Sequence, residues 1–270
     1  MGYVRTSWYY GKVAARSIVY GPPAIVAASA FNNKKVGQEM MRRWCRTSSR
    51  GLGMHVDLLD AEHLEGVEQA VFIANHLSFL DILAIGAVLP HDYRWLAKAS
   101  VFKVPMLGWH LKASGHIPVY RGAEKHRNAD IGQRMQAVVE EGASLLFFPE
   151  GTRSEDGHLQ PFRMGAFMAA VNAGLPVVPL VLRGTHEMLQ KGSFHFHPIQ
   201  DRPVTVKVLP SLHAPPEGDA RARAEALRWE AYRAFMADLH PDEVVAEGQE
   251  VADERPRAER EAAAAEGAGS

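Results

Sequence analysis

The chain has 270 residues, of which 47% are apolar and 23% charged, a balance typical of a globular protein with a substantial core. A single cysteine, Cys45, excludes an internal disulfide and any zinc or iron–sulfur site that needs several cysteines of one chain. The net charge of −1 hides a strong asymmetry between the two ends of the chain.

Residues 1–53 form a basic amphipathic segment that we expect to be helical. It holds one acidic residue, Glu39, and nine basic ones: Arg5, Lys12, Arg16, Lys34, Lys35, Arg42, Arg43, Arg46 and Arg50. An uncharged stretch from residue 17 to residue 33 is interrupted by Gly21-Pro22-Pro23, which predicts that a helix stops there. Each half is then shorter than the roughly 18 unbroken apolar residues of a plain membrane-spanning helix.

Three interpretations of this segment remain open. Its short apolar halves, its aromatic cluster at residues 8–10 and its flanking cations favour a segment that lies in the membrane interface. Alternatively, it is a soluble helical pair that packs on the core and exposes a solvated basic face. It also resembles a signal peptide, since Lys12 and Arg16 precede an apolar run that ends in Ala28-Ser29-Ala30. The Gly-Pro-Pro within that run argues against the signal peptide.

Residues 54–240 alternate between strand-like and helix-like segments. Short β-branched or aromatic runs predict strands at 56–59, 70–74, 94–97, 116–119, 144–148, 177–182 and 204–209. Helix-like segments lie at 79–89, 125–141 and 164–173, and 221–239 is typical of a closing helix. This alternation predicts an α/β fold with a mixed, largely parallel sheet flanked by helices. Ligands of such sheets gather at the carboxyl ends of the strands.

Residues 241–270 differ from both earlier parts. They contain nine acidic residues against three arginines and have no aromatic side chain. A segment of this composition buries too little apolar surface to offset its conformational entropy. We therefore predict an acidic disordered tail.

A histidine and an aspartate follow the predicted strand 70–74. The sequence there is Asn75-His76-Leu77-Ser78-Phe79-Leu80-Asp81, with Ser78 as a candidate N-cap and Asp81 three residues later, as in a capping box. The break between strand and helix is able to bring His76 and Asp81 together. An imidazole that a carboxylate orients is a suitable general base. The alternative is that Asp81 only caps the helix and His76 is an ordinary turn residue.

Arginines follow two other predicted strands. Strand 144–148 leads into Pro149-Glu150-Gly151-Thr152-Arg153, and strand 116–119 is followed by Tyr120-Arg121. A guanidinium binds a phosphate through two parallel hydrogen bonds, and a glycine lets the backbone approach a ligand closely. These residues, with Arg163 beside Gly165 further along, indicate a substrate that carries a phosphate. The alternative is that they are surface arginines in ordinary turns.

Taken in order, these motifs resemble those of the glycerolipid acyltransferases of the lysophosphatidic acid acyltransferase type. The first motif is similar to His76-(four residues)-Asp81, and the third to Phe148-Pro149-Glu150-Gly151-Thr152-Arg153-Ser154. Residues 115–121 and 178–181 are similar to the second and fourth motifs, and 98–109 to the segment that links the first two. The resemblance covers about residues 55–210. Arg163 stands where the family often has lysine.

The resemblance implies a fold like that of glycerol-3-phosphate acyltransferase and a catalytic domain over 54–240. It implies transfer of a fatty acyl group from acyl-CoA or acyl carrier protein to the sn-2 hydroxyl of 1-acyl-glycerol-3-phosphate, which yields phosphatidic acid. His76 is then the general base and Asp81 its partner. The implied substrate-binding residues are Arg121, Glu150, Gly151, Thr152, Arg153 and, on the acyl-donor side, Pro179. Neither a metal nor a cofactor is implied, and the enzyme is expected to be peripheral or monotopic on the cytoplasmic face of a membrane.

The same residues allow other functions, which the motifs support less well. The same pair of side chains acting on water makes a thioesterase or hydrolase, and other lysolipids or glycerol 3-phosphate are alternative acceptors. A non-catalytic membrane-binding protein is disfavoured by the intact motifs. His195-Phe196-His197 lacks a third metal ligand at a recognisable spacing. The apolar stretch of the basic segment suits lipid better than nucleic acid.

Overall fold

The computed structural model describes residues 2–31, 34–105, 107–199 and 201–244. Within them, one sheet has the strand order β1-β7-β6-β2-β5-β3-β4. The strands are β1 (Val56–Leu59), β2 (Val71–Ala74), β3 (Tyr93–Lys98), β4 (Ile117–Val119), β5 (Ser144–Phe147), β6 (Val177–Arg183) and β7 (Val204–Val208). β6, β2, β5, β3 and β4 run parallel, whereas β7 is antiparallel to β6 and parallel to β1. The predicted mixed, largely parallel sheet is therefore confirmed.

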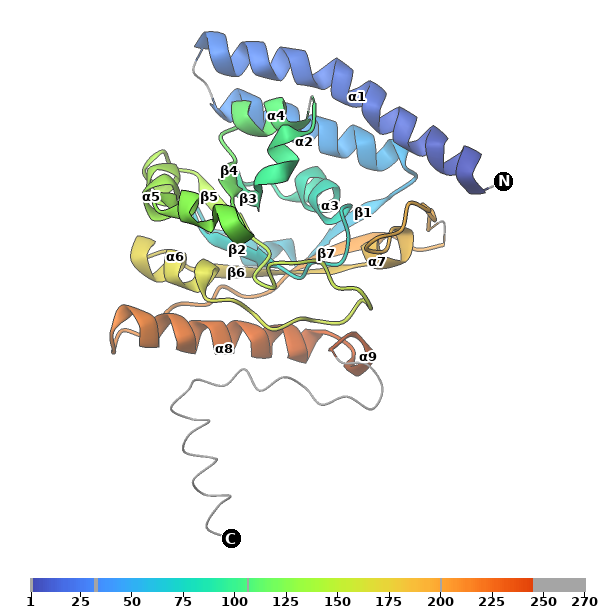
Figure 1. The fold of residues 1–270 in the computed structure, drawn as a ribbon. Helices are drawn as coiled ribbons and strands as arrows, with labels where there is room; N and C mark the ends of the chain where they lie inside the picture. Colours follow the sequence, from blue (N-terminus) through green and yellow to red (C-terminus); the bar gives the residue numbers. More distant parts are fainter. Residues whose placement is uncertain (1, 32–33, 106, 200, 245–270) are drawn as a thin grey trace.

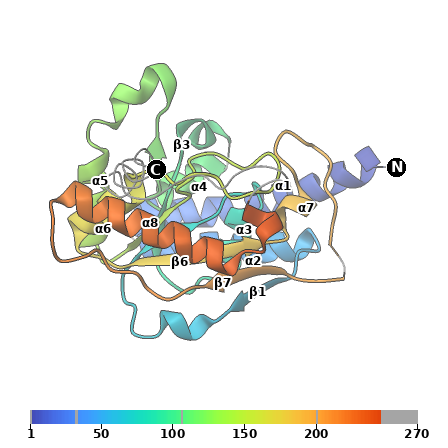
Figure 2. The same ribbon diagram turned by 90° about the horizontal axis from the view of Figure 1, so that it is seen from below.

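Helices cover both faces of this sheet (Figure 1). One face carries α1 (Gly2–Phe31), α2 (Lys34–Gly51), α3 (Asp81–Val88) and α4 (Leu107–Ala113), with α1 outermost. The other carries α5 (Ile131–Glu140), α6 (Gly165–Ala173) and α8 (Ala220–Asp238), and Figure 2 shows α8 in front of α6 and β6. The short helices are η1 (Ala61–Leu64), η2 (Ala99–Lys103), η3 (Gly122–Asn128), α7 (Thr185–Met188) and α9 (Pro241–Val244).

The central strands are apolar on both faces because they separate two cores. In β2, Phe72 and Ala74 pack toward α2 and α3, while Val71 and Ile73 pack toward α6 and α8. All four side chains are fully buried, and a large buried apolar side chain contributes about 1.5–3 kcal/mol. The sheet is thus a rigid platform whose carboxyl ends hold their positions.

The predicted stop at Pro22 and Pro23 is wrong, because α1 runs through both prolines. A proline removes one helical hydrogen bond and crowds the preceding turn, which often kinks a helix rather than ending it. Both rings are exposed, so neither clashes with a packed neighbour. Before them, Val13 and Tyr20 pack on the core and hold the helix in place. Among the described helices, none combines the length and apolar content that crossing a bilayer requires.

The second helix of the basic segment is part of the core. Met41, Trp44 and Cys45 of α2 are buried in the same cluster as β2 and α3. Cys45 is inaccessible to solvent, and a Cβ at Gly86 of α3 would lie 2.4 Å from its Sγ. Gly2–Phe31 and Lys34–Gly51 of this segment are therefore helical as predicted, but α2 cannot be removed without opening the hydrophobic core.

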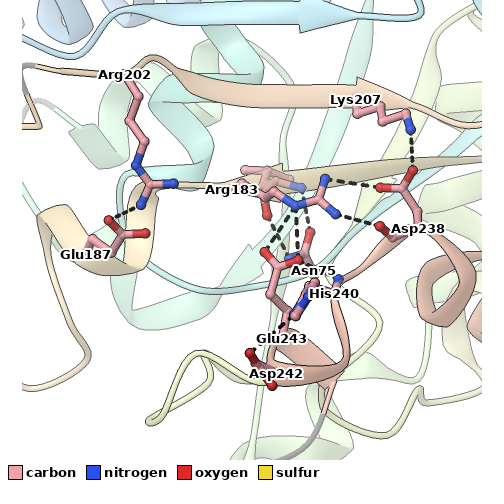
Figure 3. Close-up of polar contacts among 10 residues, drawn as sticks. Asn75, Arg183, Glu187, Arg202, Lys207, Asp238, His240, Asp242 and Glu243 are labelled. Atoms are coloured by element: carbon pink, nitrogen blue, oxygen red, sulfur yellow. Dashed lines mark hydrogen bonds and ion pairs between the residues drawn. The ribbon is translucent and has the colours of Figure 1, made fainter.

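The C-terminal helices are tied to the end of β6 (Figure 3). The Arg183 guanidinium pairs with Asp238 at 3.1 Å and with Glu243 at 3.0 Å, and Lys207 of β7 also pairs with Asp238. Residues 241–244, predicted to begin the disordered tail, instead form α9 because Glu243 is held by Arg183 and Val244 is buried. The rest of the predicted tail, 245–270, lies outside the described residues.

Candidate active site

Apart from Pro179, the predicted site residues follow strands that end at one edge of the sheet. His76 follows β2, Glu150 to Arg153 follow β5, and Arg121 follows β4. Since these strands are parallel, their carboxyl ends meet at the same edge. The expectation that ligand-binding side chains gather there depends on this topology.

His76 and Asp81 are in direct contact. The turn after β2 folds back so that His76 Nδ1 lies 2.7 Å from Asp81 Oδ2. A carboxylate oxygen only accepts hydrogen bonds, so Nδ1 carries a proton and the lone pair of the neutral ring is on Nε2. Asp81 is the first residue of α3, and its carboxylate also accepts from the backbone N–H of Ser78 at 2.9 Å. It holds the turn before α3, whose N-cap residue is Leu80, and orients the imidazole at once.

The Asp81 carboxylate is completely buried and fully hydrogen-bonded. Besides His76 and Ser78, the backbone N–H of Leu77 donates to Oδ2 at 2.8 Å. The hydroxyl of Thr185 donates to Oδ1 at 2.5 Å. Four donors compensate the cost of burying this acid, and together they fix the plane of the carboxylate against the ring.

The motif after β5 holds His76 from the other side. Glu150 Oε1 accepts from the backbone N–H of His76 at 2.8 Å, and the Ser154 N–H donates to the His76 carbonyl at 2.8 Å. The Phe148 ring stacks on the imidazole with the ring centres 4.0 Å apart. Backbone and ring of His76 are therefore both positioned by this one motif.

Glu150 was predicted to contact substrate, but the structure places its carboxyl group in the interior. Only 3% of the residue is exposed. Burial, with the negative charge of Asp81 nearby, raises the pKa of Glu150 well above that of an ordinary carboxyl group. The geometry favours a part in holding the His76 turn over direct contact with a ligand.

Three arginines lie near the motif that follows β5, and Arg153 is near Asp81. Arg153 lies over the ring of Phe79, 3.7 Å from its centre, and Arg163 donates to the Glu150 carbonyl at 3.2 Å. Partial burial and the positive charge of Arg163 lower the pKa of Arg121, so these two positive charges lie near each other. Among the described residues, none of the three forms a salt bridge. The cluster is suited to bind an anion.

The loop geometry explains the glycine in this motif. Gly151 has a φ of 74°, and a Cβ there would lie 2.7 Å from Arg163 Nε. Any other residue would be strained and would displace the arginine. The half-buried Thr152 follows it on the same turn.

Pro179 lies apart from these residues. It is buried within β6, opposite Ile73 of β2, and its carbonyl accepts from Leu209. Strand alternation puts it on the face of Val177 and Val181, toward α6 and α8. Its assignment to the acyl-donor side stays a prediction.

Thr185 is the residue that sequence reasoning missed. It follows β6, the parallel neighbour of β2, and so it meets the rule that led to the other motifs. Nothing local in the sequence marks it, because its partner Asp81 is 104 positions away.

The fold and the His76–Asp81 pair together define an acyltransferase-like domain, and comparison with known proteins agrees. Residues 55–183 match the family model described as Acyltransferase. The chain is 42% identical over 123 residues to the chloroplastic 1-acyl-sn-glycerol-3-phosphate acyltransferase BAT2 of Brassica napus, covering 46% of this chain and 35% of that protein. It is 30% identical over 231 residues to a 1-acyl-sn-glycerol-3-phosphate acyltransferase of Chlamydomonas reinhardtii, covering 85% and 66%.

The chain belongs to the acyltransferase family that its motifs resemble. Its matched segments span about a third to two thirds of the length of these two relatives. The crystal structure of the 1-acyl-sn-glycerophosphate (LPA) acyltransferase PlsC from Thermotoga maritima has a similar fold. The TM-score is 0.71 at 22% identity, over 88% of this chain and 96% of that one.

Proposed function

We propose that this protein transfers a fatty acyl group from a thioester to the sn-2 hydroxyl of 1-acyl-glycerol-3-phosphate, giving phosphatidic acid. The observation that carries the proposal is the oriented His76–Asp81 pair, with Arg153 near Asp81 and with three arginines that form no salt bridge within the described residues. The pair supplies a base, and the arginines supply a place for the acceptor's phosphate. The relatives are named for the same class of reaction.

The chemistry needs one base and no covalent enzyme intermediate. His76 Nε2 takes the proton of the acceptor hydroxyl as its oxygen attacks the thioester carbonyl. The tetrahedral intermediate then collapses, the ester bond forms, and the carbon–sulfur bond breaks. The imidazolium returns its proton to the leaving thiolate. Asp81 holds the ring and stabilises its transient positive charge.

The arginines position the acceptor in this scheme. Arg121 and Arg153 bind the phosphate, with Arg163 behind them and the Gly151–Thr152 turn approaching the glycerol. Glu150 contributes by fixing the His76 backbone. The donor is acyl-CoA or acyl carrier protein, with Pro179 on its side of the site, and the reaction uses no further cofactor.

The outer face of α1 is proposed to lie in the membrane interface. Its exposed apolar side chains follow helical spacing: Trp8, Ile18, Val19 and Val26. Phe194, in a loop that packs on the first half of α1 through the contact of Phe196 with Tyr9, is also exposed. Lys12 lies beside the rings of Trp8 and Tyr9. Aromatic and cationic groups together are typical of interfacial helices, and they support a peripheral or monotopic enzyme, which we propose to lie on the cytoplasmic face.

Product analysis tests the function directly. The purified protein is incubated with mixed lysolipids, glycerol 3-phosphate and mixed acyl thioesters, and the products are identified by mass spectrometry. We expect phosphatidic acid, and His76→Ala should lower its formation roughly 10²-fold or more. Free fatty acid as the main product would instead establish a thioesterase. A folded His76→Ala protein with normal transfer would end the assignment of the base.

A further inference from the structure

We infer that Thr185 is a positioning residue for the proposed base: its hydroxyl fixes the Asp81 carboxylate and sets how tightly the His76–Asp81 pair holds a proton. The inference rests on the proposed role of His76. It concerns a residue outside all four motifs that carried the family resemblance.

The contact itself leaves little freedom. The Thr185 hydroxyl donates to Asp81 Oδ1 at 2.5 Å, while the other three donors all bind Oδ2. Both residues are completely buried. Within the described residues, Thr185 is therefore the one group bonded to Oδ1, and water has no access to replace it. Loss of the hydroxyl would leave that oxygen without a donor.

The backbone before Thr185 is fixed at two successive residues. The Asn75 side chain binds both the N–H and the carbonyl of Leu182, at 2.8 and 3.0 Å. The next residue, Arg183, is held by Asp238 and Glu243 (Figure 3). Gly184 then reverses the chain with a φ of 92°, a conformation that favours glycine. The position of Thr185 is thus set by the sheet and by the C-terminal helices.

A second contact joins the same two segments beyond Thr185. The Ser78 hydroxyl donates to the Leu189 carbonyl at 2.6 Å. The turn from Asn75 to Asp81 is consequently bonded to residues 182, 185 and 189 in succession. This pattern indicates that residues 182–189 support the turn from Asn75 to Asp81 on one side, while Glu150 and Ser154 support it on the other.

The chemical effect of the hydroxyl has a definite sign. A donor to a carboxylate stabilises its charged form, so removing it increases the proton affinity of the acid. The pair would then hold its proton to higher pH, and the base would be free in a smaller pH range. The titratable or charged groups that face Asp81 are His76, Glu150 and Arg153. On α7, Glu187 is paired with Arg202, and His186 lies near Gly157.

Two substitutions, one that removes the hydroxyl and one that keeps it, test the inference. Thr185→Val removes the hydroxyl and keeps the shape, whereas Thr185→Ser keeps the hydroxyl. We expect Thr185→Val to lower kcat about ten-fold, since hydrogen bonds to charged groups are among the strong ones. KM for both substrates should not change, because Thr185 is too deeply buried to touch them. The acidic limb of the kcat/KM profile should move to higher pH, while Thr185→Ser should follow the wild type.

The controls separate this inference from the proposed function. The pH profile is repeated in a Glu150→Gln background, which removes the titration of that neighbour, and the shift should persist. Thermal unfolding checks folding, and Thr185→Ala replaces valine if the valine variant does not fold. Wild-type kcat and pH limb in a folded, hydroxyl-free variant would overturn the inference, as would a loss that Thr185→Ser shares. Activity retained by His76→Ala would instead overturn the proposed base, whatever Thr185→Val does.

Discussion

The proposed catalytic edge is the edge of the sheet where His76 and Asp81 follow β2. This edge and the outer face of α1 expose their side chains in opposite ways. At the edge, Asp81 is fully buried, and each of its two carboxylate oxygens accepts at least one hydrogen bond. On α1, Trp8 is 65% exposed and Ile18 63% exposed. A base needs one fixed geometry, whereas a surface that meets fluid lipid needs apolar area and no fixed partner. The difference predicts that substitutions at the edge change rates, while substitutions on α1 change where the protein binds.

The largest effect is expected from Asp81→Asn, which removes the carboxylate that orients His76. The amide keeps the shape of the carboxylate but turns an NH₂ group toward backbone or side-chain donors. We expect kcat to fall roughly 10³-fold with little change in KM. Steady-state kinetics with circular dichroism as a folding check measures this. A loss below ten-fold in the folded protein would mean that the pair is not the base.

Arg153→Ala should have the next largest effect and should act on binding. We expect the acceptor KM to rise about ten-fold or more, since a charged hydrogen bond to phosphate is lost. A monoacylglycerol acceptor, which has no phosphate, should show no difference between variant and wild type. Arg233→Ala, an exposed arginine of α8 on the far face, serves as the matched control. Equal losses with both acceptors would remove Arg153 from the phosphate site.

A double substitution, Trp8→Ala with Phe194→Ala, tests the other side of the comparison. We expect several-fold weaker partitioning to anionic vesicles and unchanged kcat on a soluble short-chain acceptor, because neither ring touches the catalytic edge. Leu59→Ala, an exposed apolar side chain at the end of β1, is the control and should partition normally. Flotation with vesicles measures the difference. Undiminished flotation of the double variant would show that this face is not the membrane contact.

The smallest effect is expected from Glu150→Gln, which tests how the Glu150 side chain holds the backbone of His76. The glutamine keeps an oxygen for the His76 N–H, so activity should stay within about three-fold, while Glu150→Ala should lose more. The pKa of Glu150 is raised in the folded state above its ordinary value of 4.5, so the wild type loses stability as pH rises from about 4.5 toward that raised pKa. Urea unfolding across this range should show that the free energy of unfolding of the glutamine variant increases relative to that of the wild type as pH rises. A constant difference would argue against a buried carboxyl group.

Local patterns predicted most of the sheet. Each predicted strand is present with its ends within one residue, because buried parallel strands are short continuous apolar runs bounded by turns. The His76–Asp81 contact was also predictable, since the two residues are five apart and span a strand–helix break. These features depend on neighbours along the chain.

Features that depend on distant partners were not predictable. The helix α4 was missed because its seven residues include Gly108, whose Cβ would collide with the Phe102 carbonyl, so tertiary packing rather than propensity selects it. The buried position of the Glu150 carboxyl group was not predictable, because a motif does not show which way a side chain points. Thr185 required the pairing of β2 with β6. The helix through Pro22 required the packing of Val13 and Tyr20.

The enclosure of Cys45 between α2 and α3 has a practical consequence. Its thiol is fully buried, and burial raises its pKa to about 12, so almost no thiolate is available to react with alkylating reagents at neutral pH. A cysteine introduced at position 194 or 8 would then be the one reactive thiol in the described part of the chain. A fluorophore or spin label attached there would report directly on how deeply each position enters a bilayer, with the native cysteine left in place.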